Sequence, residues 1–114
     1  ETDHIAAWKD SFRGIVQMGS KDKTFILSES GHIAGIVNPP AKKKYGHWRG
    51  PEPIGTPDAW KEAAAYHEGS WWPHWEAWLS KRAGKKVPAR ALGNESYPAT
   101  DPAPGSYVRE IVTG

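Results

Sequence analysis

Hydrophobic residues recur at helical spacing near the start of the chain, on a face made of Ile5, Trp8, Phe12, Ile15 and Val16. Asp3 stands just before this face, where a helix N-cap belongs, and Gly19-Ser20 follow it as a helix end. After a charged turn, Thr24–Leu27 is a short apolar run of strand-forming residues, typical of a strand buried on both faces. A helix followed by a buried strand is half of a parallel α/β unit, so we expect an α/β fold.

The periodicity is lost over residues 28–55, where prolines and glycines interrupt the chain. Within this stretch the short apolar patch Ile33, Ile36 and Val37 predicts one helical turn directly after Gly31-His32.

Two helices are predicted next. Thr56-Pro57-Asp58 combines an N-cap, a proline in the first turn and an acid near the positive helix end. We expect this helix to run to about Tyr66 or His67 and to stop at Gly69. A second helix should begin at Pro73, after Ser70 or Trp72, and end at Gly84.

The remainder is predicted to be rich in turns from Lys86 to Pro104, with a last short strand at Tyr107–Val112. One buried strand and a weak last strand cannot close a sheet, so we expect an incomplete sheet. Three regions of one domain result: residues 1–48 (acid loop, helix, strand and histidine loop), 56–84 (tryptophan-rich helices) and 85–114 (loop-rich tail).

Composition limits the class of protein. A chain of 114 residues is enough for one small domain, and a net charge of +2 is too small to indicate a nucleic-acid partner. The absence of cysteine excludes a disulfide framework and a thiolate metal site, and no apolar run is long enough to span a membrane. Because the chain begins with Glu1 and shows no signal peptide, we expect a piece of a longer, soluble, cytoplasmic protein.

Asp3 and His32 are the candidate catalytic pair. In α/β-hydrolases the triad runs nucleophile, acid, histidine along the chain, and the histidine follows the last strand. Asp3, a helix, the strand Thr24–Leu27 and then His32 reproduce the last part of that order. The spacing alone leaves two non-catalytic alternatives open, because Asp3 is equally well placed as a helix cap and His32 as a polar loop residue.

The other histidines suit structural or surface positions better than catalysis. His4 adjoins Asp3, and His47, His67 and His74 fit no metal-ligand spacing, so we predict neither a metal site nor a cofactor. The lysine-rich runs at residues 42–44 and 81–86 are typical of solvated faces.

Tryptophan is the one outlier in composition, with seven residues. Trp71, Trp75 and Trp78 fall on one helical stripe, with Trp72 beside them. We expect this stripe to be core, and the alternative is an aromatic surface for a sugar, a single-stranded nucleic acid or an apolar polymer.

Long blocks of the sequence resemble the C-terminal part of class I poly(3-hydroxyalkanoate) synthases. The blocks occur in the same order over nearly the whole chain, and the departures, Ala7 for a frequent proline and Lys43 for a frequent asparagine, do not touch the candidate pair. The matching blocks are DHIAAW (3–8), FILSESGHIAGIVNPPAKKKYGHW (25–48), GSWWPHWEAWL (69–79) and GNESYPATDPAPGSYV (93–108).

The resemblance implies an α/β-hydrolase fold in which this piece supplies the last crossover helix, the last parallel strand and the C-terminal helices. It makes Asp3 the catalytic aspartate and His32 the catalytic histidine of a triad whose cysteine lies upstream. It also implies (R)-3-hydroxyacyl-CoA as substrate, a growing polyester as product with release of CoA, and a homodimer at the surface of cytoplasmic polyester granules. By itself, a piece without the cysteine should be inactive.

Two other classes remain open from the residues. One is an esterase or depolymerase of the same fold with a serine nucleophile, and the other is a non-enzymatic tryptophan-rich binding module. The coding sequence upstream of Glu1 distinguishes the three: a cysteine at the nucleophile position supports the synthase, a serine there the esterase, and a start codon close to Glu1 the binding module.

Overall fold

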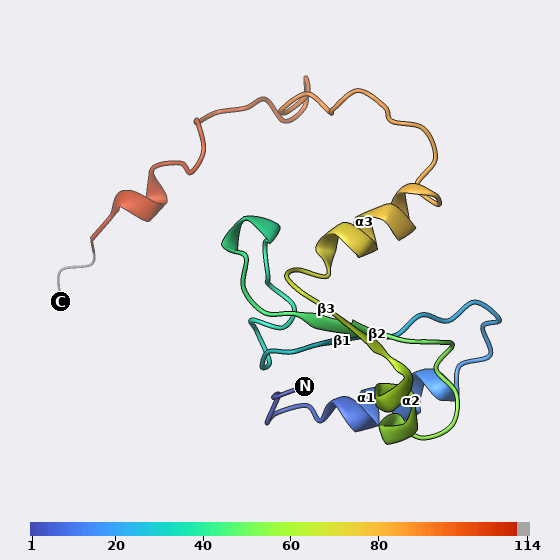
Figure 1. Cartoon of the computed structure of the whole chain (residues 1–114). Coiled ribbons are helices and arrows are strands. Elements are labelled where there is room, and N and C mark those ends of the chain that lie inside the picture. The colour runs from blue at the N-terminus through green and yellow to red at the C-terminus, as the bar shows by residue number, and fades with distance from the viewer. Residues whose placement is uncertain (112–114) are drawn as a thin grey trace. The chain divides into compact units, whose positions relative to one another are not determined.

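Three short strands in the first 84 residues pair in the order β1-β2-β3, and every pairing is antiparallel (Figure 1). The computed structural model describes residues 1–111, divided into a unit of residues 1–84 and a second unit that begins at Lys85. The elements follow the chain as α1 (Trp8–Val16), β1 (Ile26–Ser28), the 3₁₀ turn Pro40–Lys42, β2 (His47–Arg49), α2 (Pro57–Ala63), β3 (Ala65–His67), α3 (Trp72–Ser80) and a 3₁₀ turn at Tyr107–Arg109.

Helix α1 confirms the first predicted helix but not its predicted cap. The residue before the helix is Ala7, which makes no side-chain capping bond, and Asp3 instead accepts hydrogen bonds from the backbone of Ile5 and Ala6 in a separate turn. Of the predicted apolar face only Phe12 is fully buried, whereas Ile5 is 67% exposed because it lies in that turn, ahead of the helix.

Strand β1 corrects the expectation of a parallel strand without partners. Its Leu27 stands opposite Trp48 of antiparallel β2, and no parallel pairing occurs among residues 1–111. Strands β2 and β3 were not predicted, because each has only three residues and shows no detectable alternation. The chain therefore supplies its own antiparallel partners for β1.

Helix α2 begins where the sequence predicts, since Thr56 Oγ1 accepts the backbone N–H of Ala59 and Pro57 opens the first turn. Its predicted end at Tyr66 or His67 is wrong. The backbone becomes extended at Ala64, and Tyr66 joins β3 opposite Trp48, where the two rings meet edge to face at 5.1 Å. Strand pairing thus overrides the helix propensity of the alanine run.

The core is a small aromatic cluster between the sheet and the helices α1 and α2, which lie side by side (Figure 1). Phe12, Leu27 and Trp60 are buried, and the Phe25 ring packs edge-on against both Phe12 and Trp60, with centroids 5.2 and 5.1 Å apart. Leu27 points into this cluster, while its neighbour Ile26 faces a pocket lined by α3, as strand alternation requires.

Helix α3 starts at Trp72 with Pro73 in its first turn, which confirms the predicted start. Its predicted end at Gly84 is wrong, because the helix ends at Ser80 and turns lead from there to Gly84, whose φ is 76°. The core interpretation of its tryptophan stripe is wrong, because no α3 residue is buried and Trp75 is 43% exposed. No helix among residues 1–111 has the length and apolar character needed to cross a membrane.

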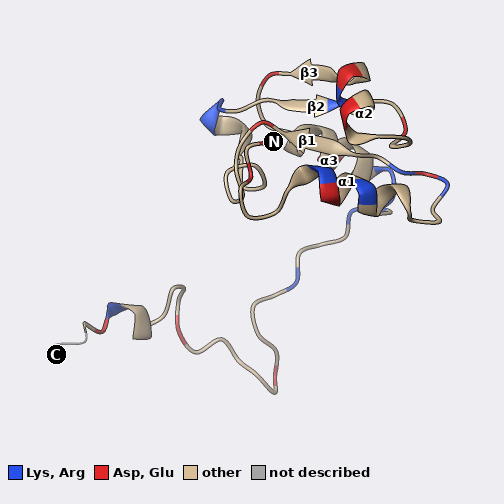
Figure 2. Cartoon of the chain, turned by 90° about the horizontal axis from the view of Figure 1, so that it is seen from below, with Lys and Arg blue, Asp and Glu red and all other residues tan. Residues whose placement is uncertain are grey.

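The second unit confirms the prediction of a turn-rich segment, with no helix or strand between Lys85 and Pro104. The predicted strand at Tyr107–Val112 is wrong over its described part, where Tyr107–Arg109 form a 3₁₀ turn, and Val112 lies outside the described residues. In the first unit, Lys and Arg alternate with Asp and Glu over several helices and loops (Figure 2).

Candidate functional site

The predicted contact between Asp3 and His32 is present. Asp3 lies in the turn that precedes α1, and His32 lies in the helical turn that follows β1. The His32 Nδ1 atom is 2.8 Å from Asp3 Oδ2. The geometric prediction drawn from the order acid, helix, strand, histidine is thus confirmed, while the catalytic role of the two residues stays a prediction.

The carboxylate of Asp3 is held through both of its oxygens. Oδ1 accepts the backbone N–H groups of Ile5 at 2.8 Å and Ala6 at 3.0 Å, which leaves Oδ2 directed at the imidazole. The pKa of Asp3 is lowered to about 2, first by the hydrogen bond from the Ala6 backbone and next by the one with His32. Asp3 is therefore a fixed anion at neutral pH.

This arrangement determines which imidazole nitrogen carries the proton. An ionised carboxylate can only accept, so His32 Nδ1 donates to Asp3 Oδ2 and the neutral ring keeps a lone pair on Nε2. The His32 side chain is 48% exposed, whereas that of Asp3 is 18% exposed. His32 Nε2 is thus available to take a proton from a group that approaches from outside, as a general base does.

The base of the histidine loop is tied to the sheet by Glu29, the residue after β1. Its Oε2 accepts the backbone N–H of Gly46 at 2.6 Å and the hydroxyl of Tyr66 at 2.9 Å. These bonds, the one from Gly46 first, lower the pKa of Glu29. A Cβ at Gly46 would overlap the Tyr66 ring, so the close approach requires glycine there.

Further along the same loop, the buried Asn38 side chain donates to the carbonyl oxygens of Lys44 at 2.8 Å and Tyr45 at 3.4 Å. Lys43 and Tyr45 both have positive φ, 47° and 54°. Asn38 thus secures the backbone turn through which the chain leaves the histidine loop and reaches β2.

A pocket of about 230 Å³ opens beside the pair, and Asp3 and His32 both line it together with Trp8 and Phe25. No cysteine occurs in the 114 residues. The chain therefore presents an imidazole, and the carboxylate that orients it, at an open pocket, and no thiol of its own.

Three histidines that the sequence left unassigned gather around Arg49. The guanidinium contacts His74 Nδ1 at 2.5 Å and His67 Nδ1 at 2.9 Å, and the His47 ring stacks on His67 at 5.5 Å. Burial is the first cause that lowers the pKa of both His47 and His74.

An arginine can only donate, so the histidine nitrogens that face Arg49 are acceptors and the two rings are neutral. No group able to hold a metal ion is found among residues 1–111. No sequence signal could have revealed the cluster, because its members come from β2, β3 and α3.

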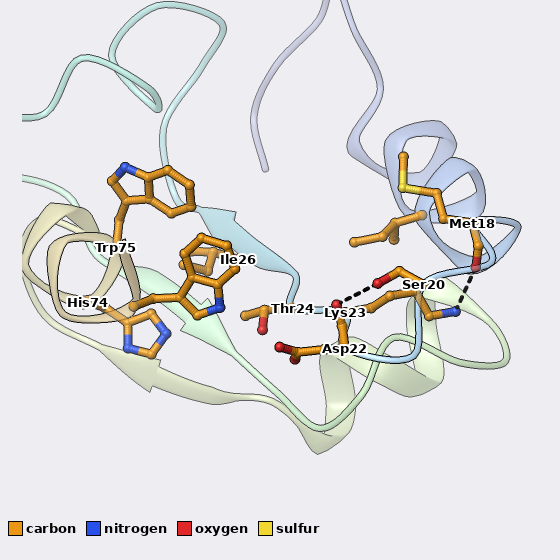
Figure 3. A pocket seen from close by; sticks show the side chains of 10 residues that line it. Met18, Ser20, Asp22, Lys23, Thr24, Ile26, His74 and Trp75 are labelled. Carbon is orange, nitrogen blue, oxygen red and sulfur yellow. Dashed lines mark hydrogen bonds between the residues drawn. The ribbon is translucent and has the colours of Figure 1, made fainter. Parts of the chain in front are cut away.

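A second pocket, of about 300 Å³, lies between the end of α1, β1 and α3 (Figure 3). Trp75 and Trp78, whose rings stack at 5.0 Å, form one wall and Ile26 part of the floor. At its rim the Ser20 hydroxyl donates to the Asp22 carbonyl. The pocket offers mainly apolar surface and includes neither Asp3 nor His32.

Comparison with known proteins finds poly(3-hydroxyalkanoate) polymerases. The chain is 47% identical over 108 residues to such a polymerase subunit from Rhizobium etli and 49% identical over 107 residues to one from Rhizobium meliloti. It is 45% identical over 108 residues to one from Cupriavidus necator.

The matches cover 94–95% of this chain but only 17–18% of these relatives, so the chain spans less than a fifth of their length. No family model matches the chain. The resemblance inferred from the sequence blocks is confirmed.

Proposed function

We propose, from the likeness to poly(3-hydroxyalkanoate) polymerases, that this chain supplies the acid and the base of an acyltransferase that polymerises (R)-3-hydroxyacyl-CoA into polyester with release of CoA. The observation that carries the proposal is the 2.8 Å contact between His32 Nδ1 and Asp3 Oδ2. We place residues 1–114 in the C-terminal part of one α/β-hydrolase catalytic domain, in which the sheet continues through segments outside this chain.

The proposed reaction begins when His32 Nε2 takes the proton of a cysteine thiol that lies outside the 114 residues. The thiolate attacks the thioester carbonyl, a new C–S bond forms, and the CoA sulfur leaves and receives the proton from His32. In the elongation step His32 takes the proton of a 3-hydroxyl group, and the oxygen attacks the thioester of an acylated cysteine. The ester bond forms as the C–S bond breaks, and the cysteine sulfur leaves and receives the proton from His32. Asp3 stabilises the imidazolium in each step.

The remaining expectations follow from the same likeness. We propose that the full-length enzyme is a homodimer that associates with cytoplasmic polyester granules and requires no metal or cofactor. The chain without its nucleophile is expected to be inactive.

An esterase or depolymerase with a serine nucleophile would use the same pair, because His32 would activate a hydroxyl in the same way. The exposed ring of Trp75 is the observation that favours a binding module instead. The product separates these classes: a polymerase yields polyester and CoA, a hydrolase yields free acid, and a binding module yields neither.

The experiment compares His32→Gln with His4→Gln in the full-length enzyme, with CoA release from (R)-3-hydroxybutyryl-CoA and polymer mass as readouts. His4 adjoins Asp3 and is exposed, so it provides a matched control. We expect His32→Gln to lower CoA release by about 10³-fold or more, and His4→Gln to stay close to the wild type. Polymerisation by His32→Gln at the wild-type rate would show that His32 is not the base.

A further inference from the structure

Two tryptophans bond the turn that carries His32. The indole Nε1 of Trp71 donates to the carbonyl oxygen of Gly35 at 2.9 Å, and that of Trp72 donates to the carbonyl oxygen of Ile36 at 2.9 Å. Two consecutive side chains at the start of α3 thus satisfy two consecutive carbonyls at the end of the His32 turn.

The turn itself is short and tightly closed. The N–H of Gly35 donates to Gly31 at 2.9 Å and that of Val37 donates to Ile33 at 2.8 Å. A Cβ at Gly35 would lie 2.8 Å from the Gly31 carbonyl oxygen. Helical geometry leaves the last carbonyls of such a turn without partners inside it, so the donors have to come from elsewhere.

The two indole N–H groups meet that need, and core packing does not explain their placement. No α3 residue is buried, and the partly exposed rings of Trp71 and Trp72 border an open apolar pocket together with Ile36 and Val37. The hydrogen bonds to the turn are therefore the specific feature of this pair.

We propose that Trp71 and Trp72 are positioning residues for His32, which rests on the proposed role of His32 as the base. His32 stands at the start of the turn, where Asp3 orients its ring, and the indoles hold the end of the same turn. A base must stay within hydrogen-bond reach of the proton it takes, and a displacement of about 1 Å can lower a rate by about 10²-fold. The indoles thus act on the reaction through the Gly35 and Ile36 carbonyls, without touching the reacting atoms.

The test uses Trp71→Phe and Trp72→Phe in the full-length enzyme, because each keeps an aromatic ring and removes the N–H donor, and the same loss of ring size occurs in the comparator. Trp60→Phe is the matched comparator: its Nε1 donates to the Pro51 carbonyl at 3.0 Å in the core, away from the turn. The readouts are kcat and KM for CoA release from (R)-3-hydroxybutyryl-CoA, Tm, and hydrogen exchange of the segment 31–38.

We expect Trp71→Phe and Trp72→Phe to lower kcat by about tenfold with little change in KM, and to speed hydrogen exchange of residues 31–38. Trp60→Phe should lower Tm and leave kcat and the hydrogen exchange of residues 31–38 near their wild-type values. The proposal requires a change in both kcat and hydrogen exchange, so a wild-type value of either one in Trp71→Phe and Trp72→Phe overturns it. An equal loss of kcat in Trp60→Phe also overturns it.

A wild-type enzyme that releases no CoA would instead mean that the proposed function has failed. Hydrogen exchange of residues 31–38 would then decide by itself whether the indoles hold the turn. Unchanged exchange in Trp71→Phe and Trp72→Phe would show that they do not.

Discussion

Replacing Asp3 by asparagine tests the proposed triad chemistry because the structure dictates how the new amide must be oriented. The backbone N–H groups of Ile5 and Ala6 both point at Oδ1, so they require an oxygen at that position. The NH₂ group of Asp3→Asn is then forced into the Oδ2 position, 2.8 Å from His32 Nδ1. There it donates to Nδ1, and the neutral ring has to carry its proton on Nε2.

The consequence is a histidine in the wrong tautomer, with a donor where the thiol proton should be accepted. In triads of this kind the equivalent change lowers kcat by up to about 10⁴-fold. We expect Asp3→Asn to lower the acylation rate by about 10²–10⁴-fold at neutral pH. The loss can be smaller than in a serine triad, because a free thiol with a pKa near 8.5 is already partly ionised and needs less help than a hydroxyl. Raising the pH should therefore recover part of the lost acylation rate.

The assay is rapid-quench CoA release by the full-length enzyme from pH 6.5 to 9.5, with Asp10→Asn as the control. Asp10 is an exposed partner of Arg13 on α1, so the same change there should leave the rate unaltered. An Asp3→Asn enzyme within about threefold of the wild type at neutral pH would refute the reasoning about the tautomer.

Two further predictions concern stability. Phe12→Ala should lower the free energy of unfolding by about 3–5 kcal/mol, because Phe12 is fully buried, whereas Trp75→Ala should cost clearly less at 43% exposure; urea unfolding measures both, and equal losses would contradict the assignment of the core. The pKa values of His47 and His74 are lowered by burial, so below a pH of about 6.5 the unfolded chain binds more protons than the folded one. Stability should therefore fall as the pH falls through that value, and an unchanged Tm between pH 7.5 and 5.5 would contradict it.

The features that the sequence predicts correctly are those set by local chemistry or chain order. Thr56-Pro57 predicts the start of α2 because a cap and a first-turn proline act within a few residues. The contact between Asp3 and His32 agrees with the order of helix and strand between them, and it is present although β1 pairs antiparallel with β2.

The features that it misses depend on distant residues. Strands β2 and β3 have three residues each and form because Trp48 pairs with Leu27 on one side and Tyr66 on the other. Glu29 adds a bond to Gly46 and one to Tyr66, across all three strands. Such pairings leave no period in the local sequence, and they also end α2 before its helix-forming residues are used up.

The tryptophans fail as a prediction for a different reason. Helical spacing correctly places Trp71, Trp75 and Trp78 along one stripe, but spacing cannot say whether a stripe is covered. In the described residues the stripe lines pockets instead of a core, and the roles of Trp71 and Trp72 depend on indole N–H groups that reach the His32 turn.

The claim that Asp3 and His32 activate a cysteine for acyl transfer requires a covalent acyl-enzyme, which can be trapped and located. The full-length protein is mixed with (R)-3-hydroxybutyryl-CoA and quenched within milliseconds, and the acylated residue is located by mass spectrometry. We predict the acyl group on one cysteine, formed together with released CoA, and formed more slowly by about 10³-fold or more in His32→Gln. Acylation of a serine, or equally fast acylation of the cysteine in His32→Gln, would contradict the claim.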